Sequence, residues 1–281
     1  MAVAGTALRP TIAEELNTAT AAIGASDART LLSHLLACSP AFLVAHPEHE
    51  LSDDDTRRYA ELVARRAAGE PVSYITGERE FYSLSFAVTP AVLIPRPETE
   101  LLVDVALERI APDSDCSVLD LGTGSGAVAL SIARHRPRVR MVAVDASAAA
   151  LAVARANARR LAVANVEFIA GDWYQNLAGR RFSAIIANPP YVAECDSHLT
   201  QGDLRFEPRA ALAAGADGLS CLRRIVAGAA AHLLPGGWLG FEHGYDQAAA
   251  CRALLGEAGF RAIVSRRDLA GIERITIGHS A

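Results

Sequence analysis

The second half of the chain alternates between two hydrophobic patterns. Short apolar runs, bounded by glycine, proline or charged residues, predict buried strands at 117–121, 140–144, 166–170 and 182–187. Between them, residues 127–134 and 148–161 have the composition of helices. Strands that alternate with helices in this way form a mainly parallel sheet covered on both faces. We therefore expect an α/β fold with a doubly wound, Rossmann-like sheet.

The first seventy residues show a different pattern. Apolar residues recur at three- and four-residue spacing from about residue 11 to 70, and strand signals are absent. The clearest helix should begin after Ser52, an N-cap residue followed by three aspartates, and end with Arg65 and Arg66 before Gly69. A helical unit of this size either positions a partner or merely packs, and both interpretations stay open.

The connecting segment between Pro71 and Pro97 is rich in aromatic and β-branched residues with intervening turn residues, which predicts a β-hairpin. A proline and acidic residues in the stretch 96–100 then open the next helix. We accordingly predict two domains. Residues 1–84 should hold a small all-helical domain and the start of the hairpin, and residues 85–281 the larger α/β domain.

A glycine-rich loop leaves the first strand of the α/β domain and precedes a helix. It comprises Gly122, Thr123, Gly124, Ser125 and Gly126, a spacing that lets the backbone approach a nucleotide-like cofactor. The next strand ends in Asp145, nineteen residues after Gly126, where a carboxylate can accept hydrogen bonds from both hydroxyls of a ribose. An N-cap for the following helix is the competing interpretation of Asp145.

The third strand ends in Gly171-Asp172-Trp173. An acidic side chain and an aromatic ring at a strand end suit the amino group and the face of an adenine. A single tryptophan is otherwise most often a core residue. Asp172 and Trp173 thus become candidate cofactor-binding residues because they share an edge of the sheet with the glycine-rich loop.

The fourth strand stops at Asn188-Pro189-Pro190-Tyr191. Two prolines cannot continue a strand ladder, so the chain must turn at Asn188. The Asn188 amide, the Pro189 carbonyl and the Tyr191 ring together fit a planar NH2 group held by two acceptors in its plane. These four residues are the candidate catalytic group, and a plain turn is the alternative. The carboxyl ends of successive strands meet in one crevice, which favours a reaction site.

Composition excludes several other chemistries. The chain contains no lysine, so a catalytic lysine or Schiff base is impossible. Five scattered cysteines predict free thiols and no zinc site. A nicotinamide enzyme would need a proton donor near the hydride, but His135, His198 and His243 are expected at the surface or in turns. No apolar stretch approaches the length of a membrane span and Met1–Pro10 lacks the features of a secretion signal, so we expect a cytoplasmic protein.

In these motifs the chain resembles the class I S-adenosylmethionine methyltransferases, and among them the peptide chain release factor glutamine methyltransferases. Asn-Pro-Pro-Tyr is shared with adenine-N6 DNA methyltransferases, whereas the Arg-Pro-x-Thr-Glu stretch at 96–100 distinguishes the glutamine enzymes. The matching stretches are residues 71–77, 81–82, 93–100, 122–126, 188–191, 207–212 and 217–219.

The resemblance implies transfer of a methyl group from S-adenosylmethionine to N5 of the glutamine in the Gly-Gly-Gln motif of class 1 release factors, which supports translation termination. It implies a Rossmann-like catalytic domain whose cofactor contacts lie at 122–126, Asp145, Trp173 and Asn188. The Asn188 side chain and the Pro189 carbonyl would hold the substrate amide. It also implies that the N-terminal helices help to dock the release factor. Because the sulfonium is already a strong electrophile, no metal is expected.

Other functions compete with this one. A related methyltransferase could act on a ribosomal-protein glutamine or on an adenine N6 amino group. A net charge of −5 and the lack of a separate basic region argue against a stable nucleic-acid partner. A binding module that has lost activity is a third possibility, and the intact Asn-Pro-Pro-Tyr motif argues against it.

Overall fold

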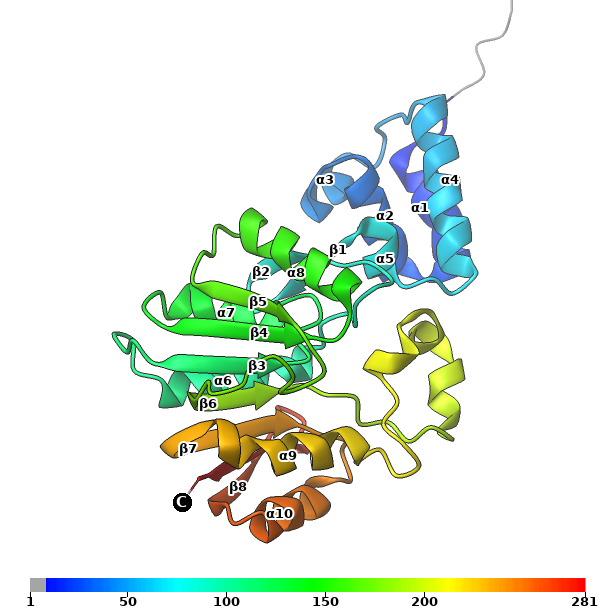
Figure 1. The fold of residues 1–281 in the computed structure, drawn as a ribbon. Helices are drawn as coiled ribbons and strands as arrows, with labels where there is room; N and C mark the ends of the chain where they lie inside the picture. The colour runs from blue at the N-terminus through cyan, green and yellow to red at the C-terminus, as the bar shows by residue number, and fades with distance from the viewer. Residues whose placement is uncertain (1–8, 281) are drawn as a thin grey trace, which may run out of the picture. The chain divides into compact units, whose positions relative to one another are not determined.

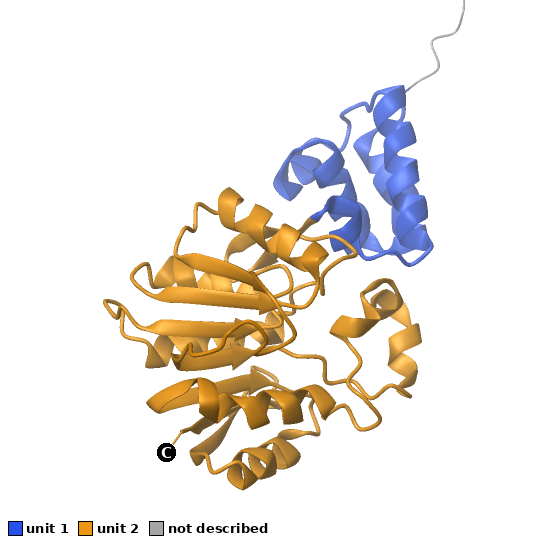
Figure 2. Ribbon diagram, in the orientation of Figure 1, with its two compact units in different colours: residues 1–77 blue, residues 78–281 orange. Residues whose placement is uncertain are grey.

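A computed structural model of the protein describes residues 9–280. Residues 1–8, which include most of the segment searched for a secretion signal, and residue 281 lie outside the described part. The chain divides into two compact units at Gly77, which we call the helical unit, residues 1–77, and the sheet unit, residues 78–281 (Figure 2). Each unit is described by itself.

The described part of the helical unit, residues 9–77, packs five helices around an apolar centre. Ile12, Leu31 and Tyr59 are fully buried there, and the Tyr59 hydroxyl donates to the carbonyl of Ala28 at 2.9 Å. The predicted helical character is confirmed, including the Ser52 cap, whose hydroxyl accepts from the Asp55 backbone N–H at 3.1 Å. The helices are α1 (Ile12–Ile23), α2 (Ala25–Leu35), α3 (Pro40–Ala45), α4 (Asp53–Ala67) and α5 (Val72–Thr76).

The expected hairpin, β1 (Glu78–Phe81) and β2 (Leu84–Ala87), is antiparallel and opens the sheet unit. Asn157, fully buried, holds it in place, because its side chain accepts from the Ala87 N–H at 2.7 Å and donates to the Ala87 carbonyl at 3.0 Å. The same amide donates to the Ser125 carbonyl at 2.9 Å. One side chain therefore links the hairpin to the glycine-rich loop.

A seven-stranded sheet, in the order β5-β4-β3-β6-β7-β9-β8, forms the centre of this unit (Figure 1). The first five strands in this order are parallel, and β9 runs antiparallel to both of its neighbours. The strands are β3 (Ser117–Leu121), β4 (Arg140–Asp145), β5 (Val166–Ala170), β6 (Phe182–Ala187), β7 (Leu233–Glu242), β8 (Arg261–Arg267) and β9 (Glu273–His279). The predicted doubly wound, mainly parallel sheet is confirmed.

Helices cover both faces of the sheet and create two apolar cores. One core includes Leu102, Leu130 and Ala158 from α6, α7 and α8, and the other includes Ile225 and Leu255 from α9 and α10. The helices are α6 (Glu100–Arg109), α7 (Ala127–His135), α8 (Ala148–Arg160), α9 (Ser220–His232) and α10 (Ala248–Glu257). Short 3-10 turns are η1 (Pro97–Thr99), η2 (Ser197–Thr200), η3 (Gly202–Phe206) and η4 (Arg209–Ala211). None of the helices within residues 9–280 is long and apolar enough to cross a membrane.

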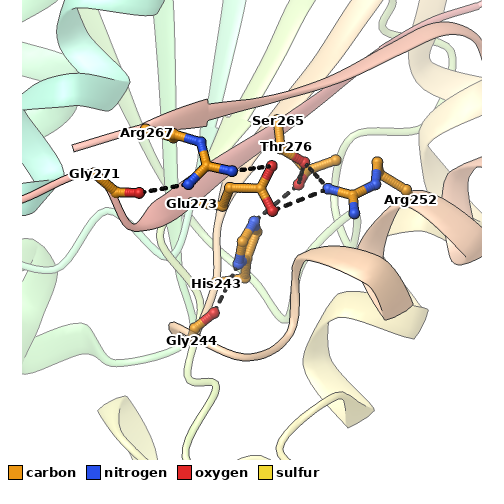
Figure 3. A network of polar contacts seen from close by, with 8 residues as sticks. All are labelled: His243, Gly244, Arg252, Ser265, Arg267, Gly271, Glu273 and Thr276. Carbon is orange, nitrogen blue, oxygen red and sulfur yellow. Dashed lines mark hydrogen bonds and ion pairs between the residues drawn. The ribbon is translucent and has the colours of Figure 1, made fainter.

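A partly buried polar network links the residue that follows β7 to side chains of β9, β8 and α10 (Figure 3). His243 is fully buried in the connection between β7 and α10, so the expectation of a surface position is wrong for it, whereas His135 and His198 are exposed as predicted. The His243 Nδ1 donates to the Gly244 carbonyl at 2.9 Å, and the His243 Nε2 accepts from the Thr276 hydroxyl at 2.8 Å. Burial lowers the pKa of His243, which keeps the ring neutral.

The network continues toward solvent through side chains that are distant in sequence. The Thr276 and Ser265 hydroxyls are 2.9 Å apart, and Arg252 donates to Ser265 at 2.8 Å. Because arginine can only donate, the protons along this path all point from Arg252 toward His243 (Figure 3). We call the set Arg252, Ser265, Thr276 and His243 the β-edge network.

Candidate active site

A cavity of about 410 Å³ lies at the carboxyl ends of the parallel strands. Its walls combine segments that follow β3, β4, β5 and β6, as expected for a ligand site in an open α/β sheet. Among the predicted site residues, Gly126, Pro189 and Tyr191 do not line it. Those that do are Gly122, Thr123, Gly124, Ser125, Asp145, Asp172, Trp173, Asn188 and Pro190.

The glycine-rich loop adopts backbone conformations that exclude larger residues. Gly126 has a φ of +83°, and a Cβ there would lie 2.9 Å from Leu130 Cδ1 and 3.3 Å from the Ala154 Cβ. Gly122 has a φ of +74°, and a Cβ there would lie 3.5 Å from the Trp173 ring, an ordinary contact distance. The first glycine is thus favoured by its backbone conformation, and the last also permits close packing of α7.

Asp145 ends β4 and fastens the glycine-rich loop. Its Oδ2 accepts from the Gly124 N–H and its Oδ1 from the Ser147 N–H, both at 2.8 Å. The N-cap of α8 is Ser147, whose hydroxyl accepts from the Ala150 N–H. Each carboxylate oxygen of Asp145 accepts only one of these hydrogen bonds, and the residue lines the cavity, so each oxygen has the capacity to accept a ribose hydroxyl as well.

Asp120, inside β3, is the most unusual group that lines the cavity. It is 2% exposed, and its Oδ2 has no hydrogen-bond partner among the residues described. Burial raises its pKa to about 7, against the effect of the Thr123 hydroxyl, and the nearby charge of Asp145 raises it further. Trp173 Nε1 is also buried without a partner in this part of the chain. Two unsatisfied polar groups therefore lie at one cavity.

The Asp172-Trp173 pair follows β5. Asp172 forms an ion pair with Arg224 of α9 at 2.5 Å, and Arg224 itself lines the cavity. Trp173 is half-buried with a φ of +53°, a backbone conformation that few non-glycine residues adopt. The pair places one acidic and one aromatic group on the wall beside the glycine-rich loop.

Asn188 and Tyr191 turn in different directions after β6. Asn188 Nδ2 donates to the Thr99 hydroxyl at 3.0 Å, and both residues line the cavity. The structure places no donor from residues 9–280 on Asn188 Oδ1. Pro189 is buried, and Tyr191 donates its hydroxyl to Glu242 Oε1 at 3.1 Å. Burial raises the pKa of Tyr191, so its hydroxyl stays protonated.

Two further contacts support this turn. Gln247 donates from Nε2 to the Tyr191 carbonyl at 3.0 Å, and Gly218, with a φ of +74°, leaves room for that carbonyl. A Cβ at Gly218 would lie 2.3 Å from the Tyr191 oxygen.

The buried carboxylate of Glu207 accepts from the Ile94 N–H at 3.0 Å and pairs with Arg96. The contacts of Glu207 thus join two segments, around Pro95 and Pro208, that line the cavity.

Sequence reasoning missed four of these groups. Asp120 and Glu242 are single acids in otherwise apolar strands, a pattern that could have marked them as buried charges. Thr99 belongs to the stretch 96–100, which predicts the start of a helix and carries part of the family resemblance, but no pattern marks Thr99 or Arg224 as a site residue. No group of three or more His, Cys, Asp or Glu side chains that could hold a metal occurs within residues 9–280.

Comparison with known proteins first defines the class. The sequence matches the PrmC N-terminal domain over residues 8–77 and the methyltransferase small domain over residues 98–206. The solved structure of the T. thermophilus 16S rRNA N2 G1207 methyltransferase, in complex with AdoMet and guanosine, is similar in fold. Its TM-score is 0.56 at 21% identity, over 73% of this chain and 50% of that one. The protein is thus a class I methyltransferase, whose cofactor is S-adenosylmethionine.

Curated relatives show which family of methyltransferases the chain belongs to. The release factor glutamine methyltransferase of Burkholderia pseudomallei (strain K96243) is 53% identical over 262 residues, which cover 91% of this chain and 92% of that protein. The Bordetella pertussis enzyme of the same name is 53% identical over 254 residues, 90% of this chain and 94% of that protein. This chain belongs to the release factor glutamine methyltransferase family. The resemblance, enzyme class and cofactor predicted from the sequence are confirmed.

Proposed function

We propose that this protein transfers the methyl group of S-adenosylmethionine to the side-chain amide nitrogen, N5, of the glutamine in the Gly-Gly-Gln motif of class 1 release factors. The observation that carries the proposal is Asn188 at the cavity wall, with Nδ2 bound to Thr99 and Oδ1 free to accept. Such a reaction on release factors takes place in the cytoplasm and requires neither a membrane nor a stable nucleic-acid partner.

The groups around the cavity fit this cofactor. Asp145 offers acceptors for the ribose diol, while the Trp173 ring and the acid of Asp172 suit the adenine. The unpartnered Oδ2 of Asp120 suits a positively charged part of the ligand, because a cation would favour the ionised carboxyl. The backbone of residues 122–126 can approach the ligand closely, since no side chains of the three glycines intervene.

Bound S-adenosylmethionine supplies an electrophilic methyl group, and the protein must align the amide nitrogen with it. An amide nitrogen is a weak nucleophile because its lone pair is delocalised. Acceptance of its N–H protons by Asn188 Oδ1 and by the Pro189 carbonyl, which is bonded to the cavity-lining Pro190, stabilises the positive charge that develops as the bond forms. The proposed catalytic group is therefore Asn188 and Pro189, with Pro190 and Tyr191 shaping the turn that presents them.

Asn188→Ala separates chemistry from binding. Removal of the side-chain acceptor should lower the single-turnover transfer rate by on the order of 10²–10⁴ and change cofactor affinity only modestly. Asn188→Asp keeps an acceptor and should be impaired less. Transfer rates, calorimetric cofactor affinity and thermal melts should be measured together. An Ala variant that transfers at the wild-type rate, or that loses activity only through unfolding, would refute the proposal.

Substrate identity can be tested with methyl-labelled cofactor and three substrates: a class 1 release factor, ribosomal proteins and oligonucleotides. Label on the glutamine of Gly-Gly-Gln is the expected result, to be located by mass spectrometry of the digested product. Label on a ribosomal-protein glutamine or on adenine N6 would instead favour one of the alternative substrates.

We also propose that the helical unit helps to dock the release factor. A protein that lacks residues 1–77 should keep its affinity for S-adenosylmethionine, because every cavity-lining residue lies in the sheet unit. Its methylation of an intact release factor should fall more than that of a short Gly-Gly-Gln peptide. Equal loss on both substrates would contradict docking.

A further inference from the structure

A buried carboxyl outside the cavity lining is connected to Asn188 through a single residue. Glu242, the last residue of β7, is 1% exposed and accepts from the Tyr191 hydroxyl at Oε1. The Thr99 hydroxyl from η1 faces the same carboxyl and favours its ionised form. Oε2 has no hydrogen-bond partner in the described part of the chain. Thr99 therefore lies between a buried acid and the proposed catalytic amide.

The direction of each hydrogen bond follows from the chemistry of the groups. Thr99 carries one hydroxyl proton and lone pairs that can accept. Asn188 donates to that oxygen from Nδ2 at 3.0 Å, so the Thr99 proton must point elsewhere. Thr99 lowers the pKa of the Glu242 carboxyl as a side-chain hydrogen-bond partner, which makes this carboxyl the acceptor for the proton. Protons consequently run from Asn188 to Thr99 and from Thr99 to Glu242.

We propose that Glu242 is a positioning residue that determines which end of the Asn188 amide faces the substrate. An ionised carboxylate can only accept, so it makes Thr99 a donor toward Glu242 and an acceptor toward Asn188. The Asn188 NH2 group is then held at Thr99, and Oδ1 is left for the substrate N–H. The inference rests on the proposed role of Asn188 in methyl transfer.

Protonation of Glu242 would reverse the same chain. A neutral carboxyl can donate to Thr99 Oγ1, and the Thr99 proton would then turn toward Asn188. Asn188 would have to offer Oδ1 to Thr99 and present its NH2 group to the substrate. Two NH2 groups would face each other, which removes the acceptor that the transfer step needs.

The groups around Glu242 set the pH at which its carboxyl becomes protonated, and this pH is near neutral. Burial raises its pKa to about 7, although the hydroxyls of Thr99 and Tyr191 and the positive charge of Arg274 on β9 favour ionisation. Glu98 on η1 acts in the opposite direction through its negative charge. Transfer should therefore slow as the pH is lowered through about 7, while the cofactor stays bound.

The test compares Glu242→Gln and Thr99→Val with the wild type. Single-turnover transfer to a release factor is measured from pH 5.5 to 8.5 with saturating cofactor, so that titration of Asp120 does not enter through cofactor affinity. Each variant should lower the rate at pH 8 by about 10- to 100-fold. Each should also remove the acid limb of the profile, that is, the fall in transfer rate as the pH drops below about 7. Thr99→Ser keeps the hydroxyl and should restore both the rate and the acid limb.

The β-edge network provides a matched control. Thr276→Val also removes a buried threonine hydroxyl, but Thr276 does not line the cavity and contacts His243 and Ser265 instead. This variant should lower the melting temperature and leave the transfer rate and its pH profile as in the wild type. A loss of activity caused by reduced stability alone would appear in the control as well.

The outcomes separate this inference from the proposed function. Wild-type rates in Glu242→Gln and Thr99→Val, or an acid limb that persists in Thr99→Val, would overturn the role of Glu242. If Asn188→Ala in the same series abolishes transfer while these variants do not, the proposed function stands without the inference. If Asn188→Ala transfers normally, the proposed function itself fails.

Discussion

Replacement of Asp120 by asparagine should reduce the pH dependence of stability in the sheet unit. The carboxyl is 2% exposed, and burial raises its pKa from 3.8 to about 7. A raised pKa in the folded state means that this group favours folding most below its unfolded pKa. That contribution is lost as the pH rises toward 7, because the folded protein must then hold a buried charge.

The size of the effect follows from the shift. Each pH unit between the two pKa values contributes about 1.4 kcal/mol to the free energy of unfolding, so the interval from pH 5 to about 7 contributes about 3 kcal/mol. The amide that replaces the carboxyl cannot ionise. The free energy of unfolding of Asp120→Asn, relative to the wild type, should therefore increase by about 3 kcal/mol between pH 5 and pH 8.

Urea denaturation of the cofactor-free protein, followed by tryptophan fluorescence, measures this difference. Both tryptophans, Trp173 and Trp238, lie in the sheet unit, so the signal is not affected by the helical unit. Glu242 titrates in the same range in both proteins and cancels in the comparison. A difference between variant and wild type that is the same at pH 5 and pH 8 would refute the buried, destabilising charge at Asp120.

Three further predictions concern the cavity. Asp145→Ala should weaken S-adenosylmethionine binding by roughly 2–4 kcal/mol in calorimetry, the worth of two charge-assisted hydrogen bonds; unchanged affinity would assign Asp145 only to the loop. Gly218→Ala should slow transfer at least about 10-fold because its Cβ would meet the Tyr191 carbonyl at 2.3 Å. Gly271→Ala is the control, because Gly271 has a similar φ of +80° but open space around it. This variant should not slow transfer. Cofactor affinity should rise with pH through about 7 in the wild type and stay flat in Asp120→Asn, as titration calorimetry at several pH values can show.

The fold was predictable because its signals are local. The strand predicted at 117–121 corresponds to β3 and that at 182–187 to β6, since continuous apolar runs buried on both faces leave little choice of conformation. The cap at Ser52 was equally clear, because its partner, the Asp55 N–H, lies three residues away. Neither result required knowledge of which elements meet in space.

The parts that could not be predicted depend on contacts between distant residues. His243 resembled a turn residue because its partner Thr276 lies on another strand, 33 positions along the chain. Thr99 meets Asn188 across 89 positions, and Tyr191 meets Glu242 across 51. A sequence pattern can place each residue at a strand end or in a turn, but the pairing arises only when the sheet forms.

The buried acids also explain why the site departs from ordinary core rules. A charge inside an apolar strand lowers stability unless it is paired, yet Asp120 and Glu242 each keep one oxygen without a partner among the described residues. Amide substitutions should relieve that cost at neutral pH and impair cofactor binding at Asp120 or methyl transfer at Glu242. Variants selected only for stability should therefore lose these two carboxyls early, because each lowers the free energy of unfolding at neutral pH.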